Sequence, residues 1–344
     1  MPDPPGVMLL DGQNRCGLGV VRALGRRGVT SVVGATERWA MAGYSRFSVG
    51  HFVYPRLCDD LSGAVDAVLQ MASNWRPRVI LPIGDDGWRL GWEVEDSLPP
   101  EVSLAPSPGL DLFEATFDKA RLAVLAARAG VEMPEGWLPE SWQQLADATD
   151  RVSMPVVLKP RETTGGVGIR RVERADALLS IARAADGPVP IVQEWFEGDD
   201  VTVSLLADKG APLVACVYRT LRQWPHPYGP SVASKTIRDP EALDAAFRLV
   251  RSLGYRGIAN LDFRRSRSDG RLKLLDFNAR FGGTTEIALA SGVDLAWIWR
   301  GCSGGWRPTV RGWTGIDRRR VSSSDGRSSP TCCAWRAPSV RWAS

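Results

Sequence analysis

The stretch LLDFNARFGG, residues 274–283, determines the fold expected for the second half of the chain. At the two-residue period of a β-strand it has an apolar face with Phe277, Ala279 and Phe281 and an ionic face with Asp276, Asn278 and Arg280. The leucines just before it predict a largely buried strand. Burying a carboxylate, an amide and a guanidinium side by side is costly unless a partner compensates them.

Composition indicates a globular protein with more than one packed lobe. The chain has 344 residues, of which 44% are hydrophobic and 24% charged. Its first basic residue is Arg15, so no signal peptide is expected, and no apolar run approaches the roughly 20 residues of a membrane span. We therefore expect a cytoplasmic protein without a membrane partner. The six cysteines show no C-x-x-C spacing and the chain has two histidines, which argues against a zinc site or a disulfide framework.

The net charge of +4 does not predict a nucleic-acid partner. Residues 301–344 contain eight arginines and two aspartates, so the positive charge lies in this tail and the rest of the chain is slightly acidic. A nucleic-acid function would rest on the tail alone, and none is expected.

Residues 1–110 predict an α/β domain built on a parallel sheet. A strand at 7–12, a helix at 17–28 and a strand at 30–36 form a first βαβ unit, and a helix at 61–75 with a strand at 78–86 continues it. The glycines at 12, 17 and 19 also permit a dinucleotide-binding turn, but G-x-G-x-x-G is incomplete. A tight turn that enters a helix is the favoured interpretation.

Residues 111–300 predict an α+β domain. Residues 111–130 are periodic enough for one helix that ends at Gly130, and 154–172 predict a strand, a glycine-rich turn and a second strand. Further strands turn at 208–210, a helix begins at Pro240 with Asp239 as its cap, and a hairpin turns at 269–270.

The stretch around Lys159 indicates an anion site. Lys159 ends an apolar strand, where its charge is poorly solvated, and the turn ETTGGVG (162–168) offers backbone N–H groups with little side-chain obstruction. The lysine precedes the glycines, so this is not a P-loop. A flexible hairpin beside a lysine whose amine reaches solvent is an equally good interpretation of this stretch alone.

Two further stretches carry polar groups after strands. In QEWFEGDD (193–200), an apolar backbone segment is suited to an adenine edge and a carboxylate to ribose hydroxyls, although an ordinary acidic turn also fits. In the closing hairpin, Asp262 lies on one strand and Asp276 and Asn278 on its partner, a set of oxygen ligands that suits Mg²⁺ shared with phosphates. A structural ion-pair cluster is less attractive, because Arg280 alone leaves too little positive charge.

These motifs together resemble the ATP-grasp superfamily. The order DK (118–119), VVLKP (156–160), a glycine-rich loop, QEWFEGDD, NLDF (260–263) and LLDFNARFGG is similar to its members over roughly residues 1–300. Three segments, RTLRQWPHPYGPS, GYRGIANLDFR and KLLDFNAR, look most like carboxylate–amine ligases related to D-aspartate ligase. The resemblance implies an α/β lobe at 1–110 followed by an ATP-grasp domain of two lobes at 111–300, with a lid at about 151–197.

The resemblance also implies roles for individual residues. The phosphates of ATP would meet two lysines and a mobile glycine-rich lid: Lys119, Lys159, Thr163, Thr164, Gly165, Gly166 and Gly168. Adenine and ribose would meet Glu194, Trp195, the Phe196 backbone and Asp200. One or two Mg²⁺ ions, with Mn²⁺ as a substitute, would bind Asp262, Asp276 and Asn278. Arg280 would face the transferred phosphoryl group, and Lys235 with Arg222 lies where such enzymes bind the carboxylate or γ-phosphate.

The reaction implied is ATP-dependent joining of a small carboxylate to an amine through an acyl phosphate. Two alternatives stay open: a carboxylase or carbamoyl-phosphate type of enzyme that uses bicarbonate, and a nucleotide-binding protein without turnover. The chain departs from the family at Asp276, where many members have glutamate, and at Ala279, where proline is usual. Nothing in the sequence sets the oligomeric state.

Residues 301–344 depart further. This tail has four Trp, eight Arg and eight Ser but no Leu, Phe, Tyr or Lys, and it shows no helical or strand period. It cannot bury enough apolar surface to order itself. We expect it to be out-of-frame translation of a GC-rich gene, and the alternative is a natural basic, disordered tail.

Overall fold

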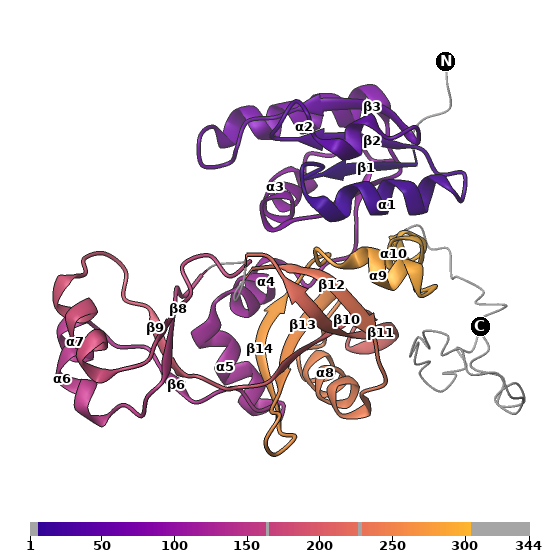
Figure 1. Cartoon of the computed structure of the whole chain (residues 1–344). Coiled ribbons are helices and arrows are strands. Elements are labelled where there is room, and N and C mark those ends of the chain that lie inside the picture. The colour runs from indigo at the N-terminus through magenta and orange to yellow at the C-terminus, as the bar shows by residue number, and fades with distance from the viewer. Residues whose placement is uncertain (1–5, 163–164, 226–228, 304–344) are drawn as a thin grey trace, which may run out of the picture.

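The N-terminal part of the chain is a parallel sheet covered by helices (Figure 1). The computed structural model describes residues 6–162, 165–225 and 229–303, so the tail from 304 onward lies outside the described residues. All strand pairs of this sheet are parallel, in the order β3-β2-β1-β4-β5. Its strands are β1 (Val7–Leu10), β2 (Ser31–Ala35), β3 (Ser48–Val53), β4 (Val79–Pro82) and β5 (Ser103–Leu104). Its helices are α1 (Arg15–Gly25), η1 (Met41–Tyr44), α2 (Leu61–Trp75) and α3 (Asp85–Glu95).

The parallel α/β class predicted for this region is confirmed, but β3 was not predicted. It is an edge strand, and Val49 and Val53 on its outer face are 44% and 49% exposed. Such a strand lacks the continuous apolar run that marks the buried central strands β1 and β4.

Two helices connect this sheet to the rest of the chain, where one was predicted. The structure has α4 (Leu110–Phe117) and α5 (Lys119–Arg128), because Asp118 between them is extended, with φ −74° and ψ 110°. Its carboxylate accepts hydrogen bonds from the N–H groups of Ala120 and Arg121 and caps α5. The periodicity of 111–130 hid this break, because both helices present apolar residues at the same spacing.

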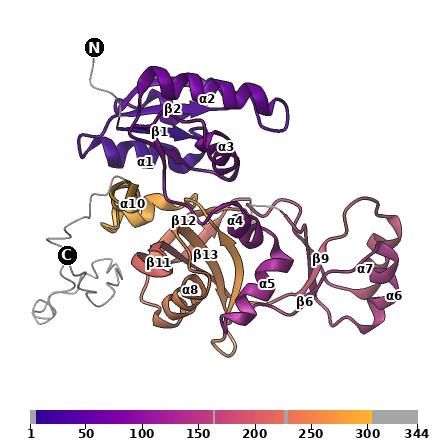
Figure 2. The same cartoon turned by 180° about the vertical axis from the view of Figure 1, so that it is seen from behind.

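A small antiparallel sheet, the lid sheet, projects to one side of the molecule (Figures 1 and 2). Its strand order is β6-β9-β7-β8, with β6 (Gly136–Trp137), β7 (Val156–Lys159), β8 (Arg170–Val172) and β9 (Ile191–Glu194). The helices α6 (Trp142–Ala148) and α7 (Ala175–Ala184), with η2 (Thr149–Arg151), complete it. It has its own apolar core around Leu145, Leu158 and Leu178, separate from the main core of the protein.

A second antiparallel sheet, the large sheet, forms the centre of the molecule. Its order is β12-β11-β10-β13-β14, with β10 (Asp199–Asp208), β11 (Ala211–Gln223), β12 (Ser231–Thr236), β13 (Gly257–Arg265) and β14 (Leu272–Asn278). Helix α8 (Pro240–Ser252) packs on β10 and β11, and Asp239 caps it as predicted. The α+β architecture with two antiparallel sheets is thus confirmed for this half.

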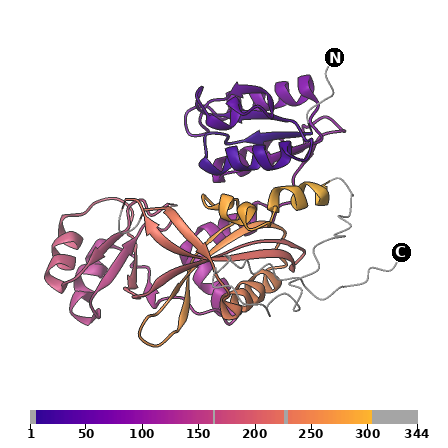
Figure 3. The ribbon, with the colours of Figure 1, turned by 45° about the vertical axis from the view of Figure 1, so that its right-hand side comes forward.

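Two short helices lie between the parallel sheet and the large sheet (Figure 3). They are α9 (Thr285–Ala290) and α10 (Leu295–Ser303), and both contact α1. Trp299 of α10 is fully buried, with ring centroids 5.6 Å from Trp88 and 5.4 Å from Phe281. One continuous apolar core therefore crosses this seam. No helix in the described part of the chain is long and apolar enough to cross a membrane.

Candidate active site

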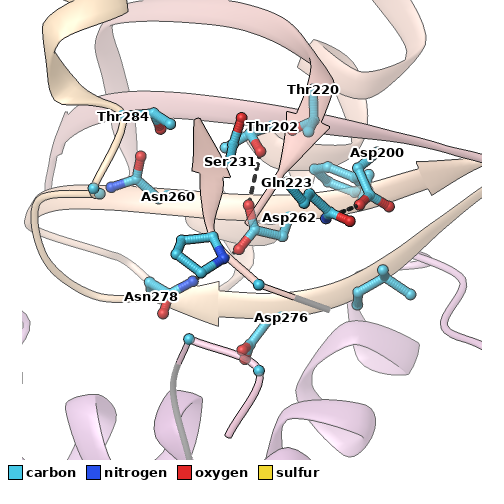
Figure 4. A pocket seen from close by; sticks show the side chains of 18 of the residues that line it. Asp200, Thr202, Thr220, Gln223, Ser231, Asn260, Asp262, Asp276, Asn278 and Thr284 are labelled. Carbon is cyan, nitrogen blue, oxygen red and sulfur yellow. Dashed lines mark hydrogen bonds between the residues drawn. The ribbon is translucent and has the colours of Figure 1, made fainter. Parts of the chain in front are cut away.

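A cavity of about 670 Å³ lies where the lid sheet, the large sheet and the parallel sheet meet. Its walls include Lys159 from β7, Asp262 from β13, Asp276 from β14 and Asp85 from α3. Ten of its polar residues are labelled in Figure 4. The segments that carry the predicted chemistry are therefore brought to one place from opposite ends of the chain.

The stretch at 274–283 has the two faces that its pattern predicts. Phe277, Ala279 and Phe281 are buried in the main core, whereas Asp276 and Asn278 line the cavity. Strand β14 pairs with β13 so that Asp276 lies opposite Asp262, and a register irregularity leaves Leu275 without a partner. This bulge allows Leu274 and Phe277 both to be buried while Asp276 turns toward the cavity.

The partly buried carboxylate of Asp262 is the centre of the predicted metal site. Thr202 Oγ1 donates to its Oδ1 at 2.8 Å (Figure 4). Asn278 Nδ2 donates to its Oδ2 at 3.0 Å. Burial, with the charge of Asp276 as a second cause, raises the pKa of Asp262 to about 7. A cation between the carboxylates of Asp262 and Asp276 would offset the cost of placing two negative charges close together away from water. The residues present therefore fit Mg²⁺. The described residues contain no group of three or more His, Cys, Asp or Glu side chains placed to hold a metal, so the donor set is two carboxylates and an amide.

Two buried lysines line the same cavity as these carboxylates. Lys119, the first residue of α5, has its Nζ 3.8 Å from Asp276 Oδ2, and its side chain is 6% exposed. Burial lowers the pKa of Lys159 to about 8, and the charge of Lys119 contributes to the same shift. An anion bound between the two lysines would stabilise the charged form of Lys159.

The carboxylates predicted to meet adenine and ribose are held by protein cations. Glu194 is paired with the buried Lys273 and accepts a hydrogen bond from the Glu135 N–H at 3.1 Å. Asp200 accepts from Arg264 Nε and from Gln223 Nε2, each at 2.7 Å. All of these predicted groups line the cavity, but both carboxylates are fixed by neighbours that the motif did not reveal.

The two aromatic residues beside these carboxylates, Trp195 and Phe196, have different surroundings. The indole ring of Trp195 lies under two guanidinium groups, with Arg171 4.3 Å and Arg264 5.1 Å from its centroid. Phe196 is buried, and Lys273 Nζ is 4.7 Å from its ring. The cation–π contacts orient Trp195 at the rim of the cavity.

The glycine-rich turn borders the cavity between β7 and β8. Gly165, Gly166 and Gly168 have φ of 67°, 79° and 73°, in the left-handed region that favours glycine. Gly165 and Gly166 line the cavity, whereas Gly168 packs close to Pro160. Thr163 and Thr164 lie outside the described residues.

Two predicted residues lie away from the cavity. Lys235 is exposed on β12 and is not among the cavity-lining residues. Arg222 on β11 lines a second pocket beside Trp224, which shares Trp195 and Asp200 with the cavity. Their strands border the site, but the structure does not bring these two side chains into it.

Residues from the parallel sheet complete the cavity, and the motifs did not predict them. Asn14, Arg15 and Cys16 follow β1, and Gly84 and Asp85 follow β4. Strands β1 and β4 are neighbours at the point where the strand order of the sheet reverses, which is where open α/β sheets bind ligands. The polar residues that follow these two strands were the sequence signal from which this part of the cavity could have been predicted.

The fold joins a parallel α/β sheet to two antiparallel sheets, and the cavity lies where the three sheets meet. Residues 116–284 match the family model described as "ATP-grasp domain". This part of the chain is an ATP-grasp domain, and the predicted resemblance to that superfamily is confirmed.

Known proteins of several activities are similar to the chain. D-alanine–D-alanine ligase B of Xanthomonas campestris is 29% identical over 178 residues, which are 46% of this chain and 55% of that protein. The chain spans about half the length of this curated relative. A biotin carboxylase from Campylobacter jejuni has a TM-score of 0.71 at 15% identity, covering 87% of this chain and 70% of that one. An L-amino acid ligase from Bacillus licheniformis has a TM-score of 0.68 at 16% identity, covering 88% and 75%. The last two likenesses concern the fold alone.

Proposed function

We propose that the protein is an ATP- and Mg²⁺-dependent ligase that activates a small carboxylate as an acyl phosphate for attack by an amine. The observation that carries this proposal is the meeting of two buried lysines, Lys119 and Lys159, with the paired carboxylates Asp262 and Asp276 in one cavity. Cations on one side and carboxylates with an amide on the other suit a metal-bound triphosphate. The likeness to a D-alanine–D-alanine ligase supports the carboxylate–amine class.

The triphosphate would lie between the lysines and the lid. Lys119 and Lys159 are poised to neutralise its oxygens, because both side chains are buried in the wall of the cavity and carry positive charge. Gly165 and Gly166 would present backbone N–H groups from above, and Thr163, Thr164 and Gly168 belong to the same turn.

The nucleoside would lie at the opposite end of the cavity. The backbone of Phe196 and the side chain of Glu194 border the space proposed for adenine, with Trp195 at its rim. Asp200 would accept hydrogen bonds from the ribose hydroxyls. These bonds would replace, or add to, the hydrogen bond that Asp200 accepts from Gln223. These assignments follow the motif, and Arg264 keeps Asp200 directed at the cavity.

Asp262, Asp276 and Asn278 would hold Mg²⁺, and Mn²⁺ fits the same oxygen donors. The bound cation would supply charge neutralisation for the phosphate groups. Thr202 and Asn278 already orient both oxygens of Asp262, so this carboxylate needs little reorganisation on binding.

The proposed reaction has two steps. A carboxylate oxygen attacks the γ-phosphorus of ATP, the bond to the β,γ-bridging oxygen breaks, and ADP leaves. The amine nitrogen then attacks the carbonyl carbon of the acyl phosphate, phosphate leaves, and the nitrogen gives up a proton to form the amide. Arg280, at the end of the cavity near Asp85, would stabilise charge on the transferred group.

A substrate panel tests this proposal. We expect ADP release that requires Mg²⁺, a small carboxylate and an amine together, with a new amide detected by mass spectrometry. ADP release that depends on bicarbonate would replace the proposal with the carboxylase type. ATP binding without ADP release under any combination would indicate a binding protein without turnover.

A further inference from the structure

Asp85 and Arg280 face each other across the seam between the parallel sheet and the large sheet, although 195 residues separate them in the chain. Asp85 is the first residue of α3, and Arg280 lies two residues beyond the end of β14. Arg280 Nε donates to Asp85 Oδ1 at 2.8 Å, and the two side chains are 16% and 18% exposed. Both line the cavity, so the contact lies within its wall.

Two further hydrogen bonds fix the guanidinium of Arg280. Its Nη1 donates to the Phe281 carbonyl at 3.1 Å, and its Nη2 donates to Asn278 Oδ1 at 3.2 Å. A guanidinium has five N–H groups in a rigid plane, so two remain for a ligand after these three bonds. Asp85 supplies the only charged acceptor among the three, and such a bond is roughly twice as strong as a neutral one.

The seam has extensive apolar packing in addition to this ion pair. The seam already buries Trp299 against Trp88 and Phe281 in a continuous apolar core. A partly buried ion pair adds little net stability, because desolvation of both charges offsets their attraction. The direction of Arg280 is the property that depends most on Asp85.

We propose that Asp85 is a positioning residue that aims the remaining N–H groups of Arg280 at the phosphoryl group during its transfer. This inference rests on the proposed function. Asp85 carries its contribution through Arg280 and touches no reacting atom itself. The parallel sheet therefore takes part in phosphoryl transfer through one carboxylate.

The adjacent Asp86 is a matched control. It is the second residue of the same helix, but its side chain is 63% exposed and its nearest cation, Arg89 Nη1, is 3.5 Å away. Asp85→Ala and Asp86→Ala remove the same atoms and the same charge from neighbouring positions. Only the first change removes a partner of Arg280.

The test compares MgADP binding with and without aluminium fluoride, by titration calorimetry on the full chain. Fluoroaluminate beside ADP imitates the phosphoryl group in transfer, and such mimics bind more tightly than ground-state ligands. We expect the wild-type protein and Asp86→Ala to bind MgADP more tightly with fluoroaluminate. Asp85→Ala should bind MgADP with wild-type affinity but lose about tenfold or more of that tightening.

The outcomes separate this inference from the proposed function. Absence of MgADP binding by the wild-type protein contradicts the proposed function. The inference alone is overturned if fluoroaluminate tightens MgADP binding equally in wild type and Asp85→Ala. It is also overturned if wild type binds MgADP but fluoroaluminate does not tighten this binding. If Asp85→Ala fails to bind MgADP, Asp85→Asn decides: it keeps the shape and loses the charge, so reduced tightening supports the inference and wild-type tightening overturns it.

Discussion

Asn278 donates a hydrogen bond from Nδ2 to Asp262 Oδ2 at 3.0 Å, and its Oδ1 accepts one from Arg280 Nη2 at 3.2 Å. One amide thus connects the partly buried carboxylate of Asp262 on β13 to Arg280, which contacts Asp85 of the parallel α/β part. Asn278 and Asp262 lie on neighbouring strands, near each other in the register of the hairpin. This bridge gives the amide two roles, as a proposed metal ligand and as an orienting group.

Replacing Asn278 or Arg280 tests the bridge. We expect Asn278→Ala and Arg280→Ala each to lower turnover by about a hundredfold or more, because each removes a group aimed at developing charge. Circular dichroism and the unfolding temperature should stay close to wild type. Full activity in either variant would mean that the site is misplaced.

Lys159 gives a pH-dependent stability with a defined sign. Its pKa falls from 10.5 to about 8 on folding, so the folded state binds fewer protons than the unfolded state between these values. Burying the charged lysine lowers the free energy of unfolding by on the order of 3 kcal/mol. This cost is fully present below about pH 8 and is relieved as the pH rises toward 10.5. We expect Lys159→Met without nucleotide to be more stable than wild type at pH 7, with an advantage that shrinks by pH 10.

Urea unfolding at several pH values measures this difference. Lys235→Met is the control, because Lys235 is exposed on β12. An advantage of Lys159→Met that does not change with pH would show that Lys159 is charged and solvated in the folded protein.

We expect Asp118 to affect both stability and nucleotide binding. Its carboxylate caps α5 and pairs with Arg161 Nη2 at 2.6 Å, next to the glycine-rich turn. We expect Asp118→Ala to cost about 1 kcal/mol of the free energy of unfolding through the lost cap, and also to weaken ATP binding because Lys119 begins that helix. Asp150→Ala is a suitable control in the lid. A loss of stability with unchanged ATP affinity would restrict Asp118 to capping.

Trp299 is predicted to hold the seam. We expect Trp299→Ala to lower the free energy of unfolding by about 3–5 kcal/mol, because it empties a fully buried site between Trp88 and Phe281. Trp224→Ala should change it by no more than about 0.5 kcal/mol, since Trp224 is 73% exposed. Equal effects of the two substitutions in thermal or urea unfolding would contradict this packing.

Sequence by itself determined the local patterns and the class of fold. The two faces of the stretch at 274–283, the parallel and antiparallel strands and the cap at Asp239 all follow from periodicity and turn chemistry, which act over a few residues. The edge strand β3 was not predicted, because its exposed apolar residues obscure the alternation of apolar and polar positions. The break at Asp118 was not predicted, because the apolar spacing continues from α4 to α5 across the helix cap.

Tertiary structure alone decided which side chains meet. Glu194 and Asp200 are held by Lys273, Arg264 and Gln223, and Lys235 is exposed on β12 and does not line the cavity. The pairing of Asp85 with Arg280 depends on how the parallel sheet and the large sheet meet at the seam, and no local pattern encodes a contact between residues 195 apart. Short-range preferences set the elements, and the packing of the seam completed the candidate site.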